Sequence, residues 1–419
     1  MSAISDVVAA PGETLAQQFA RTRALSESLA DPLSDADATI QSMEDASPAK
    51  WHLAHTTWFF ETFLLRDGKP GYQLYDEKFP FLFNSYYEAE GERIGRFARG
   101  MLSRPTLDEI REWRAHVTRE MAPLLDDPAH AGLIALGIAH EQQHQELLLT
   151  DIKHALFQNP LGPAMWPEPT CRGMAGPGPL AGDLPWHEHP GGIALIGHDG
   201  TGFAYDNEGP RHRVLLDPFA LAPRLVTNGQ WDEFIADGGY RDAALWLSDG
   251  WAWVQENDIA APLYWRDGDH GPQQFSHYGW VHRVAEEPVT HISFYEADAY
   301  ATWAGKRLPS EFEWEAVAGQ GDPQGGHQLD EGSYVLPAGG DELFGDCWQF
   351  TRSAYLPYPR YQPAAGAVGE YNGKFMSGQC VLKGASCATV RGHSRASYRN
   401  FFYPHQRWQF TGLRLARDL

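Results

Sequence analysis

The chain has 419 residues, 43% hydrophobic and 21% charged, so it is long enough for two domains and has the composition of a soluble globular protein. Its formal net charge of −22 repels phosphate backbones and anionic membrane surfaces, which argues against a nucleic-acid or membrane partner. With no signal peptide, no apolar run long enough to span a bilayer and no CxxC pair among its 4 cysteines, it is expected to be a reduced, cytoplasmic protein.

Four helices are predicted between residues 13 and 160. The first carries apolar side chains at helical spacing, namely Leu15, Phe19, Leu25 and Leu29. A polar loop at 33–39 separates it from the second helix, which is predicted to begin with Ser47 as its N-cap and Pro48 at the first helical position. Together with two further helices downstream, these segments predict a four-helix bundle.

The third and fourth helices follow a long insertion. Residues 72–101 lack helical periodicity, and an insertion of this size between two helices is usually functional. The third helix is predicted from the capping box at 106–109 to about residue 125. The fourth is predicted to span 129–157, because Asn159-Pro160 then ends it.

The composition changes after the bundle. We predict a helical domain at 1–162, a Pro- and Gly-rich linker at 163–188 and a second domain at 189–419. Short apolar runs in the second domain predict strands at 191–198, 211–221, 288–294 and 380–386. The only clear helical pattern there is EADAYATWAGK at 296–306, so an α+β fold with much irregular structure is expected.

The strongest chemical signal is His140-Glu-Gln-Gln-His144 on the fourth predicted helix. Two histidines at positions i and i+4 lie on one helix face, and both imidazoles can reach a single metal ion at roughly 2.0–2.2 Å. The flanking residues are apolar, so the helix is buried and its imidazoles need partners. His55, in the middle of the second helix, is the candidate third ligand, whereas His52 lies nearer the polar end and is expected to be structural.

Three alternatives follow from the same residues. The two histidines of the pair can be hydrogen-bonded core residues, and three imidazoles suit zinc as well as iron. The run also fits HExxH, the signature of zinc hydrolases, with Glu141 as general base, but the expected third ligand is missing downstream. Asp151, two turns beyond His144, can orient a metal ligand or be a solvated surface carboxylate.

A family resemblance covers nearly the whole chain after about residue 40. The bundle motifs are LAH at 53–55, LFNSYYEA at 82–89 and HEQQHQELLLTDIKHAL at 140–156. The second half adds FAYDNEGPRHRV at 203–214, SFYEADAYATWAGKRLPSEFEWE at 293–315 and LKGASCATVRGHSRASYRNFF at 382–402. In combination these segments resemble the ergothioneine-biosynthesis sulfoxide synthases. The resemblance implies a DinB-like four-helix bundle followed by a domain similar to formylglycine-generating enzyme and C-type lectins.

The resemblance also implies the chemistry. Family members bind iron(II) through three histidines, which correspond here to His55, His140 and His144, and use dioxygen as co-substrate. They join a thiol to C2 of the imidazole of hercynine, the trimethylated histidine. A tyrosine of the NSYY motif supplies a proton, which makes Tyr86 and Tyr87 the catalytic candidates.

Several further residues are expected to bind substrate. An aromatic face suits the trimethylammonium group of hercynine, with an attraction of ~0.5–2 kcal/mol. By resemblance, the hercynine contacts are expected at Gln143 and Asn400 and among the aromatic residues Tyr398, Phe401, Phe402 and Trp408.

The second substrate is the donor of sulfur or selenium. The insertion keeps three arginines of the family pattern, Arg93, Arg96 and Arg99, and Arg93 and Arg96 are the predicted donor contacts. Arginine forks suit the two carboxylates of γ-glutamylcysteine, but here Glu90 and Glu92 are added beside them. We expect these carboxylates to favour a neutral, hydroxyl-rich donor such as the selenosugar of the similar selenoneine synthases. A sulfoxide synthase that uses γ-glutamylcysteine or cysteine is the alternative.

Overall fold

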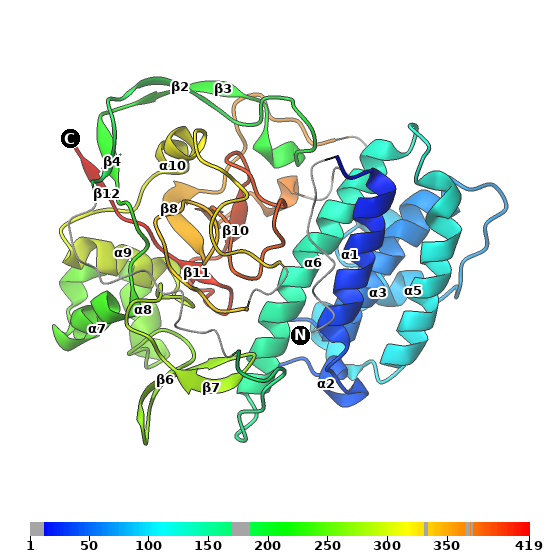
Figure 1. The fold of residues 1–419 in the computed structure, drawn as a ribbon, viewed down its shortest axis with the longest axis horizontal. Coiled ribbons are helices and arrows are strands. Elements are labelled where there is room, and N and C mark those ends of the chain that lie inside the picture. Colours follow the sequence, from blue (N-terminus) through cyan, green and yellow to red (C-terminus); the bar gives the residue numbers. More distant parts are fainter. Residues whose placement is uncertain (1–11, 170–184, 331–333, 365–368, 370–371) are drawn as a thin grey trace.

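The computed structural model describes residues 12–169, 185–330, 334–364, 369 and 372–419. The predicted linker at 163–188 therefore lies largely outside the described residues, as does Cys171. Figure 1 shows two parts, a helical bundle and a mixed domain of short strands and helices, with the long helix α6 between them. In the described residues, no helix combines the length and the apolar character that crossing a membrane requires.

The bundle consists of α1 (Leu15–Ala30), α3 (Ala49–Phe60), α5 (Leu107–Met121) and α6 (Ala131–Phe157). Capping boxes begin α1 and α5, in which the Thr14 and Thr106 hydroxyls each accept a backbone N–H of the first turn. The four-helix prediction is confirmed, with one correction. Pro48 itself is the N-cap of α3, and the Ser47 N–H donates to the buried carboxylate of Asp151.

The segments between the bundle helices are more ordered than expected. The predicted polar loop contains a short helix, α2 (Asp35–Thr39), because the Ser34 side chain caps it. Helix α3 continues as a π-helical segment at Glu61–Arg66. The insertion holds α4 (Phe79–Phe83) and 3₁₀ turns at Glu88–Glu90 and Arg96–Met101, and another 3₁₀ turn at Ala122–Leu124 follows α5.

The second domain has four small sheets in its described residues. Their orders are β1-β4-β12, β2-β3, β5-β6-β7 and β10-β9-β8-β11, in which the β8–β11 pair is parallel and the others are antiparallel. The first two comprise β1 (His187–His189), β4 (Phe219–Leu221), β12 (Ala416–Asp418), β2 (Gly192–Ile196) and β3 (His212–Leu216). The others comprise β5 (Trp265–Gly268), β6 (Gly271–Ser276), β7 (Gly279–His282), β8 (Trp348–Ala354), β9 (Cys380–Lys383), β10 (Asn400–Phe402) and β11 (Thr411–Gly412).

Two sequence-based predictions for this domain need correction. The helix predicted at 296–306 is α9 (Phe294–Trp303), but the described residues hold three more, α7 (Asn228–Ala236), α8 (Ser248–Glu256) and α10 (Glu311–Ala318). These helices have 8 or 9 residues, too short for their apolar period to stand out. The apolar run at 288–294 forms no named strand, only an isolated bridge between Pro288 and Thr227.

Helix α6 joins the two domains. Near its C-terminal end, the ring of Phe157 packs against Tyr264 and Phe275 at centroid distances of 4.9 and 5.6 Å. In its middle, the half-buried carboxylate of Glu146 accepts hydrogen bonds from Trp348 Nε1 at 2.7 Å and from the Ser386 hydroxyl at 2.6 Å. The two halves therefore share one continuous core, and the face of α6 that carries His144 lies at their junction.

Candidate metal centre and substrate pocket

Three histidines from two helices converge in the bundle. His140 and His144 lie one turn apart on α6, and His55 faces them from α3. One ring nitrogen of each lies within 4.8 Å of the others, and the ring centroids are 4.6–4.9 Å apart. In the part of the chain that the structure describes, this is the only cluster of three such side chains close enough to share a metal ion.

The tautomer of His55 is fixed by its surroundings. Its Nδ1–H donates to the carbonyl oxygen of Phe83 at 2.6 Å, so the lone pair is on Nε2. The ring stacks between Trp51 and Trp58 at centroid distances of 4.6 and 5.4 Å, which prevents it from turning. His55 Nε2 is buried and has no hydrogen-bond partner among the described residues, as expected for a nitrogen that is a metal ligand.

Burial keeps the three imidazoles neutral. It lowers the pKa of His140 to about 3 and those of His55 and His144 well below the ordinary value, with further lowering of the latter two by neighbouring histidines. A neutral imidazole keeps the lone pair that a metal ion needs. Buried nitrogen ligands with the His55 lone pair turned into the cluster therefore fit a divalent transition metal.

Glu141 does not belong to this centre. Its carboxylate accepts from Arg114 at 2.7 Å, Arg23 at 3.0 Å and the Ser26 hydroxyl at 2.6 Å, all of which lie on α1 and α5. Burial alone would raise its pKa, but the two arginines lower it to about 2. A carboxylate held in this way cannot act as general base at the histidine cluster, which removes the basis for an HExxH hydrolase.

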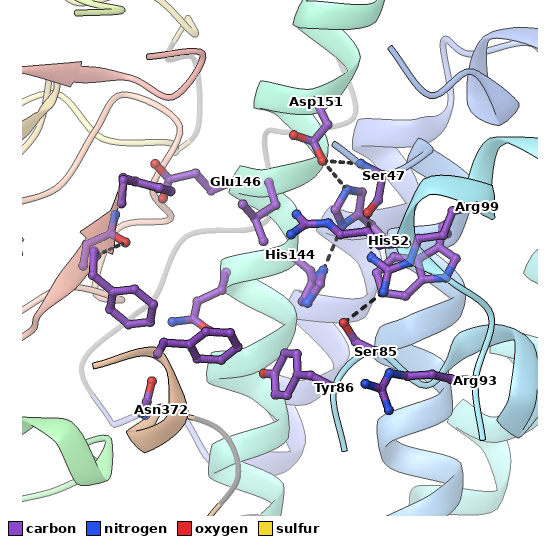
Figure 2. Close-up of a pocket in the computed structure, with 18 of the residues that line it drawn as sticks. Ser47, His52, Ser85, Tyr86, Arg93, Arg99, His144, Glu146, Asp151 and Asn372 are labelled. Carbon is purple, nitrogen blue, oxygen red and sulfur yellow. Dashed lines mark hydrogen bonds and ion pairs between the residues drawn. The ribbon is translucent and has the colours of Figure 1, made fainter. Parts of the chain in front are cut away.

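A cavity of about 1000 Å³ opens beside the histidines at the junction of the two domains. His144 lines it, together with Trp51, His52 and Arg99, whereas His55 and His140 lie behind them. Figure 2 shows Tyr86 and Arg93 of the insertion on the bundle side and Asn372 on the opposite side. The C-terminal domain contributes Tyr205, Trp348, Tyr398, Asn400, Phe401 and Phe402.

Most of the predicted site residues meet at this cavity. Lining residues among them are Gln143, His144, Tyr86, Arg93, Arg96, Asn400, Phe401 and Phe402. Tyr87 and Trp408 are buried and do not line it. Tyr87 packs against Trp58 at 5.4 Å, and the Trp408 indole donates to Asp151 at 3.2 Å.

The comparison with known proteins follows the division into two domains. Residues 18–148 match the DinB superfamily, and residues 189–342 match the sulfatase-modifying factor enzyme 1-like domain. Hercynine oxygenase of Mycolicibacterium smegmatis is 32% identical over 451 residues, covering 97% of this chain and 99% of its own. The chain belongs to the hercynine oxygenase family. It is therefore an oxidoreductase, and the family indicated by the sequence motifs, the ergothioneine-biosynthesis sulfoxide synthases, is confirmed.

A second relative agrees with this assignment. The hercynine oxygenase of Mycobacterium tuberculosis is 32% identical over 437 residues, covering 97% of this chain and 99% of its own. Among solved structures, PvdO from Pseudomonas aeruginosa is 19% identical with a TM-score of 0.38, covering 57% of this chain and 95% of its own.

Sequence reasoning named Tyr398 among the aromatic candidates for hercynine, but it did not predict Trp348, Tyr205 or Arg99 as substrate contacts. The Tyr398 hydroxyl accepts from Gln143 Nε2 at 2.6 Å, and its ring stacks on Trp348 at 5.4 Å. Tyr205 stands in the FAYDNEGPRHRV motif, which was a usable signal, but Trp348 has no sequence motif that marks it. Arg99 is buried over the Trp51 ring at 3.5 Å, and its spacing from Arg93 and Arg96 was visible in the sequence.

Proposed function

We propose that the chain joins sulfur or selenium to C2 of the imidazole of hercynine, with iron(II) on His55, His140 and His144 and dioxygen as co-substrate. The observation that carries this proposal is a cluster of three neutral imidazoles, two of them buried and the third at the wall of a large cavity, in a member of the hercynine oxygenase family. Three protein ligands leave coordination positions open for substrates. When bound, iron(II) supplies the binding and reduction of dioxygen.

The reaction balances without a further reductant. Hercynine gives up the hydrogen at C2, the donor gives up its S–H or Se–H hydrogen, and the new carbon–chalcogen bond joins the two. One oxygen atom of dioxygen leaves as water with these two hydrogens, and the other stays on sulfur or selenium as the oxide. The protein has to hold both substrates at the centre and provide a proton while oxygen is reduced.

The C-terminal wall of the cavity suits hercynine. The ring of Tyr398 contacts those of Trp348 and Tyr205 at centroid distances of 5.4 and 5.8 Å. Aromatic faces attract a trimethylammonium group by ~0.5–2 kcal/mol. Gln143, one residue before the ligand His144, offers an amide next to the imidazole of the substrate. Asn400, Phe401 and Phe402 line the same wall.

Tyr86 is the candidate proton donor. Its position on the cavity wall supports this role, whereas Tyr87 lies behind it, with the two rings stacked at 4.8 Å. The Lys374 ammonium lies 4.8 Å from the Tyr86 ring and also donates to the Tyr86 carbonyl oxygen, so the side chain is held from the C-terminal domain. Tyr398 is the second candidate, since it lines the cavity and its hydroxyl is the acceptor, not the donor, in its hydrogen bond with Gln143.

The arginines of the insertion support a neutral donor. Arg93 pairs with Glu88 at 2.5 Å, Arg96 donates to the backbone carbonyl of Asp45, and Arg99 donates to Ser47 and Ser85 at 2.9 and 3.0 Å. The carboxylate of Glu92 also lines the cavity. Glu88 neutralises Arg93, and Glu92 adds a negative charge beside Arg96 and Arg99, so a dianionic peptide is attracted less than by three unopposed guanidinium groups, which favours a hydroxyl-rich selenosugar. The other added carboxylate, Glu90, pairs instead with Arg66 at 2.8 Å, outside the cavity lining.

One assay tests the reaction and the donor together. Protein reconstituted anaerobically with iron(II) should consume oxygen when hercynine and a donor are both present, and mass spectrometry should show the hercynine adduct. We expect a selenosugar to be used in preference to γ-glutamylcysteine and cysteine in direct competition. Turnover of the thiols alone would leave a sulfoxide synthase, and no adduct with any donor would overturn the proposal.

Matched variants test the electrostatic argument. Glu88→Gln or Glu92→Gln should raise kcat/KM for γ-glutamylcysteine several-fold, because a carboxylate beside the arginines is lost. Glu90→Gln is the control, since Glu90 has its partner in Arg66. An equal rise in all three variants would mean that overall charge, and not the cavity, controls donor choice.

A further inference from the structure

A chain of hydrogen bonds connects His144 to a buried carboxylate through a second histidine. His144 Nδ1 lies 2.8 Å from Nδ1 of His52, and His52 Nε2 lies 3.1 Å from Oδ2 of Asp151 (Figure 2). His52 is 3% exposed and Asp151 4% exposed, so water does not compete for these bonds. His52 itself is not part of the three-histidine cluster, and Asp151 contributes no ligand atom to it.

The order of donors along this chain determines the tautomer of His144. An ionised carboxylate only accepts, so His52 Nε2–H is the donor to Asp151. In a neutral imidazole the other nitrogen accepts, so His52 Nδ1 takes its hydrogen bond from His144 Nδ1–H. The lone pair of His144 is then on Nε2, which leaves that nitrogen free to bind metal. The reverse order would protonate His144 Nε2 and prevent metal binding.

Asp151 is held in place by both domains. The Ser47 N–H at the start of α3 donates to its Oδ2 at 2.8 Å, and the Trp408 indole of the C-terminal domain donates to its Oδ1 at 3.2 Å. With His52, three donors engage the two oxygens, so the carboxylate cannot rotate away. Trp408, expected to contact the substrate, instead secures this carboxylate.

We propose that Asp151 and His52 are positioning residues that fix His144 in its metal-binding tautomer, and that Trp408 makes this arrangement depend on the docked C-terminal domain. The inference rests on the proposed metal centre and goes beyond it, because it concerns two residues that touch neither the metal nor the substrate's reacting atoms. Partners of this kind typically contribute about 10–100-fold to metal affinity. The wrong tautomer of a correctly placed histidine is enough to abolish its role.

The test is a double-mutant cycle on metal affinity. Co(II), and Fe(II) under anaerobic conditions, are titrated against a chromophoric chelator into wild type, Asp151→Ala, His52→Leu and the double variant. Each single variant should bind metal about 10–100-fold more weakly. The double variant should be no weaker than His52→Leu alone, because Asp151 acts only through His52. The visible absorption of bound Co(II) should change in the variants that lose the His52 partner.

Two controls make every outcome decisive. His154→Gln removes another histidine of α6, whose Nδ1 lies 2.7 Å from the Ser42 hydroxyl, and should leave metal affinity unchanged. Asp151→Asn replaces Asp151→Ala if the latter does not fold. It should show a smaller loss, because its amide oxygen can still accept from His52 and the Ser47 N–H, although not from Trp408 as well.

Wild-type metal affinity in a folded Asp151 variant would contradict the proposed positioning role of Asp151 and His52. Additive losses in the double variant would do so too, because they would assign Asp151 a direct effect of charge. If the wild type itself bound no metal, and His144→Ala did not differ from it, the proposed metal centre would fail instead. The two failures are therefore distinguishable.

Discussion

Helix α6 buries two polar clusters of opposite character on two of its faces. His140 joins His55 and His144 on one face, and the next residue, Glu141, joins Arg23 and Arg114 on the other. Glu141, Arg23, Arg114, His55 and His140 are buried, whereas His144 also lines the cavity, and burial acts on the pKa values of both clusters. They differ in whether the protein itself supplies hydrogen-bond or ion-pair partners for their polar atoms.

The charged cluster is complete. The carboxylate of Glu141 has two guanidinium groups and a hydroxyl as partners, and Arg114 also pairs with Glu27 at 2.8 Å. The histidine cluster instead keeps a buried nitrogen, His55 Nε2, without any partner in the described structure. The difference teaches that burial of polar groups does not by itself indicate function. A functional site is indicated instead by a buried lone pair that has no partner within the protein and can bind a metal ion.

The largest effect is expected from breaking the histidine cluster. His144→Ala should abolish iron binding and turnover, because two imidazoles remain where three are needed, while the thermal unfolding of the metal-free protein changes little. Iron stoichiometry by elemental analysis and oxygen uptake with hercynine measure this. Stoichiometric iron in the variant would contradict the assignment of the ligands.

The second largest effect is expected from removing the hydroxyl of Tyr86, the candidate proton donor beside the histidine cluster. Tyr86→Phe should slow adduct formation by about 10²–10⁴-fold, the usual contribution of a general acid, with oxygen diverted to oxidation of the donor. Tyr87→Phe should have a much smaller effect on the rate, because Tyr87 does not line the cavity. Single-turnover kinetics with product analysis compare the two. Wild-type coupling in Tyr86→Phe would move the role to Tyr398.

Breaking the charged cluster should affect stability and leave the metal site intact. Glu141→Gln leaves two buried guanidinium groups short of a counter-charge, which costs about 3–5 kcal/mol in the free energy of unfolding. Urea denaturation measures the loss. Iron bound per folded molecule should equal that of the wild type, and a parallel loss of iron would show that the two faces of α6 are coupled.

The smallest effect comes from removing the metal. A ligand at 100 times its dissociation constant stabilises the folded state by about 2.7 kcal/mol, so chelation should lower the thermal midpoint of the wild type accordingly. Glu141→Gln should keep this metal-dependent shift, and His144→Ala should lose it. Calorimetry with and without metal measures both. A shift in His144→Ala would place the stabilising metal elsewhere.

The sequence alone determined the helical bundle and the ligand pair. Apolar spacing, the N-terminal proline of the second helix and the capping box of the third predict the helices through local physics, and the i, i+4 spacing places His140 and His144 on one face whatever the tertiary structure is. The combination of motifs also indicated the family. The short helices α7, α8 and α10 were missed because a pattern of two turns is weaker than the contacts that stabilise it.

Only the tertiary structure decided the roles of particular polar residues. In the sequence, His52 and Asp151 were a structural histidine and an ambiguous carboxylate, and Trp408 was a substrate contact. Folding brings the three together, since residues 52, 151 and 408 come from α3, α6 and the C-terminal domain. Hydrogen bonds between segments so far apart in the chain depend on packing, which no local pattern encodes. The sequence therefore contains the residues that hold the metal, and the packing of the two domains determines which neighbours orient them.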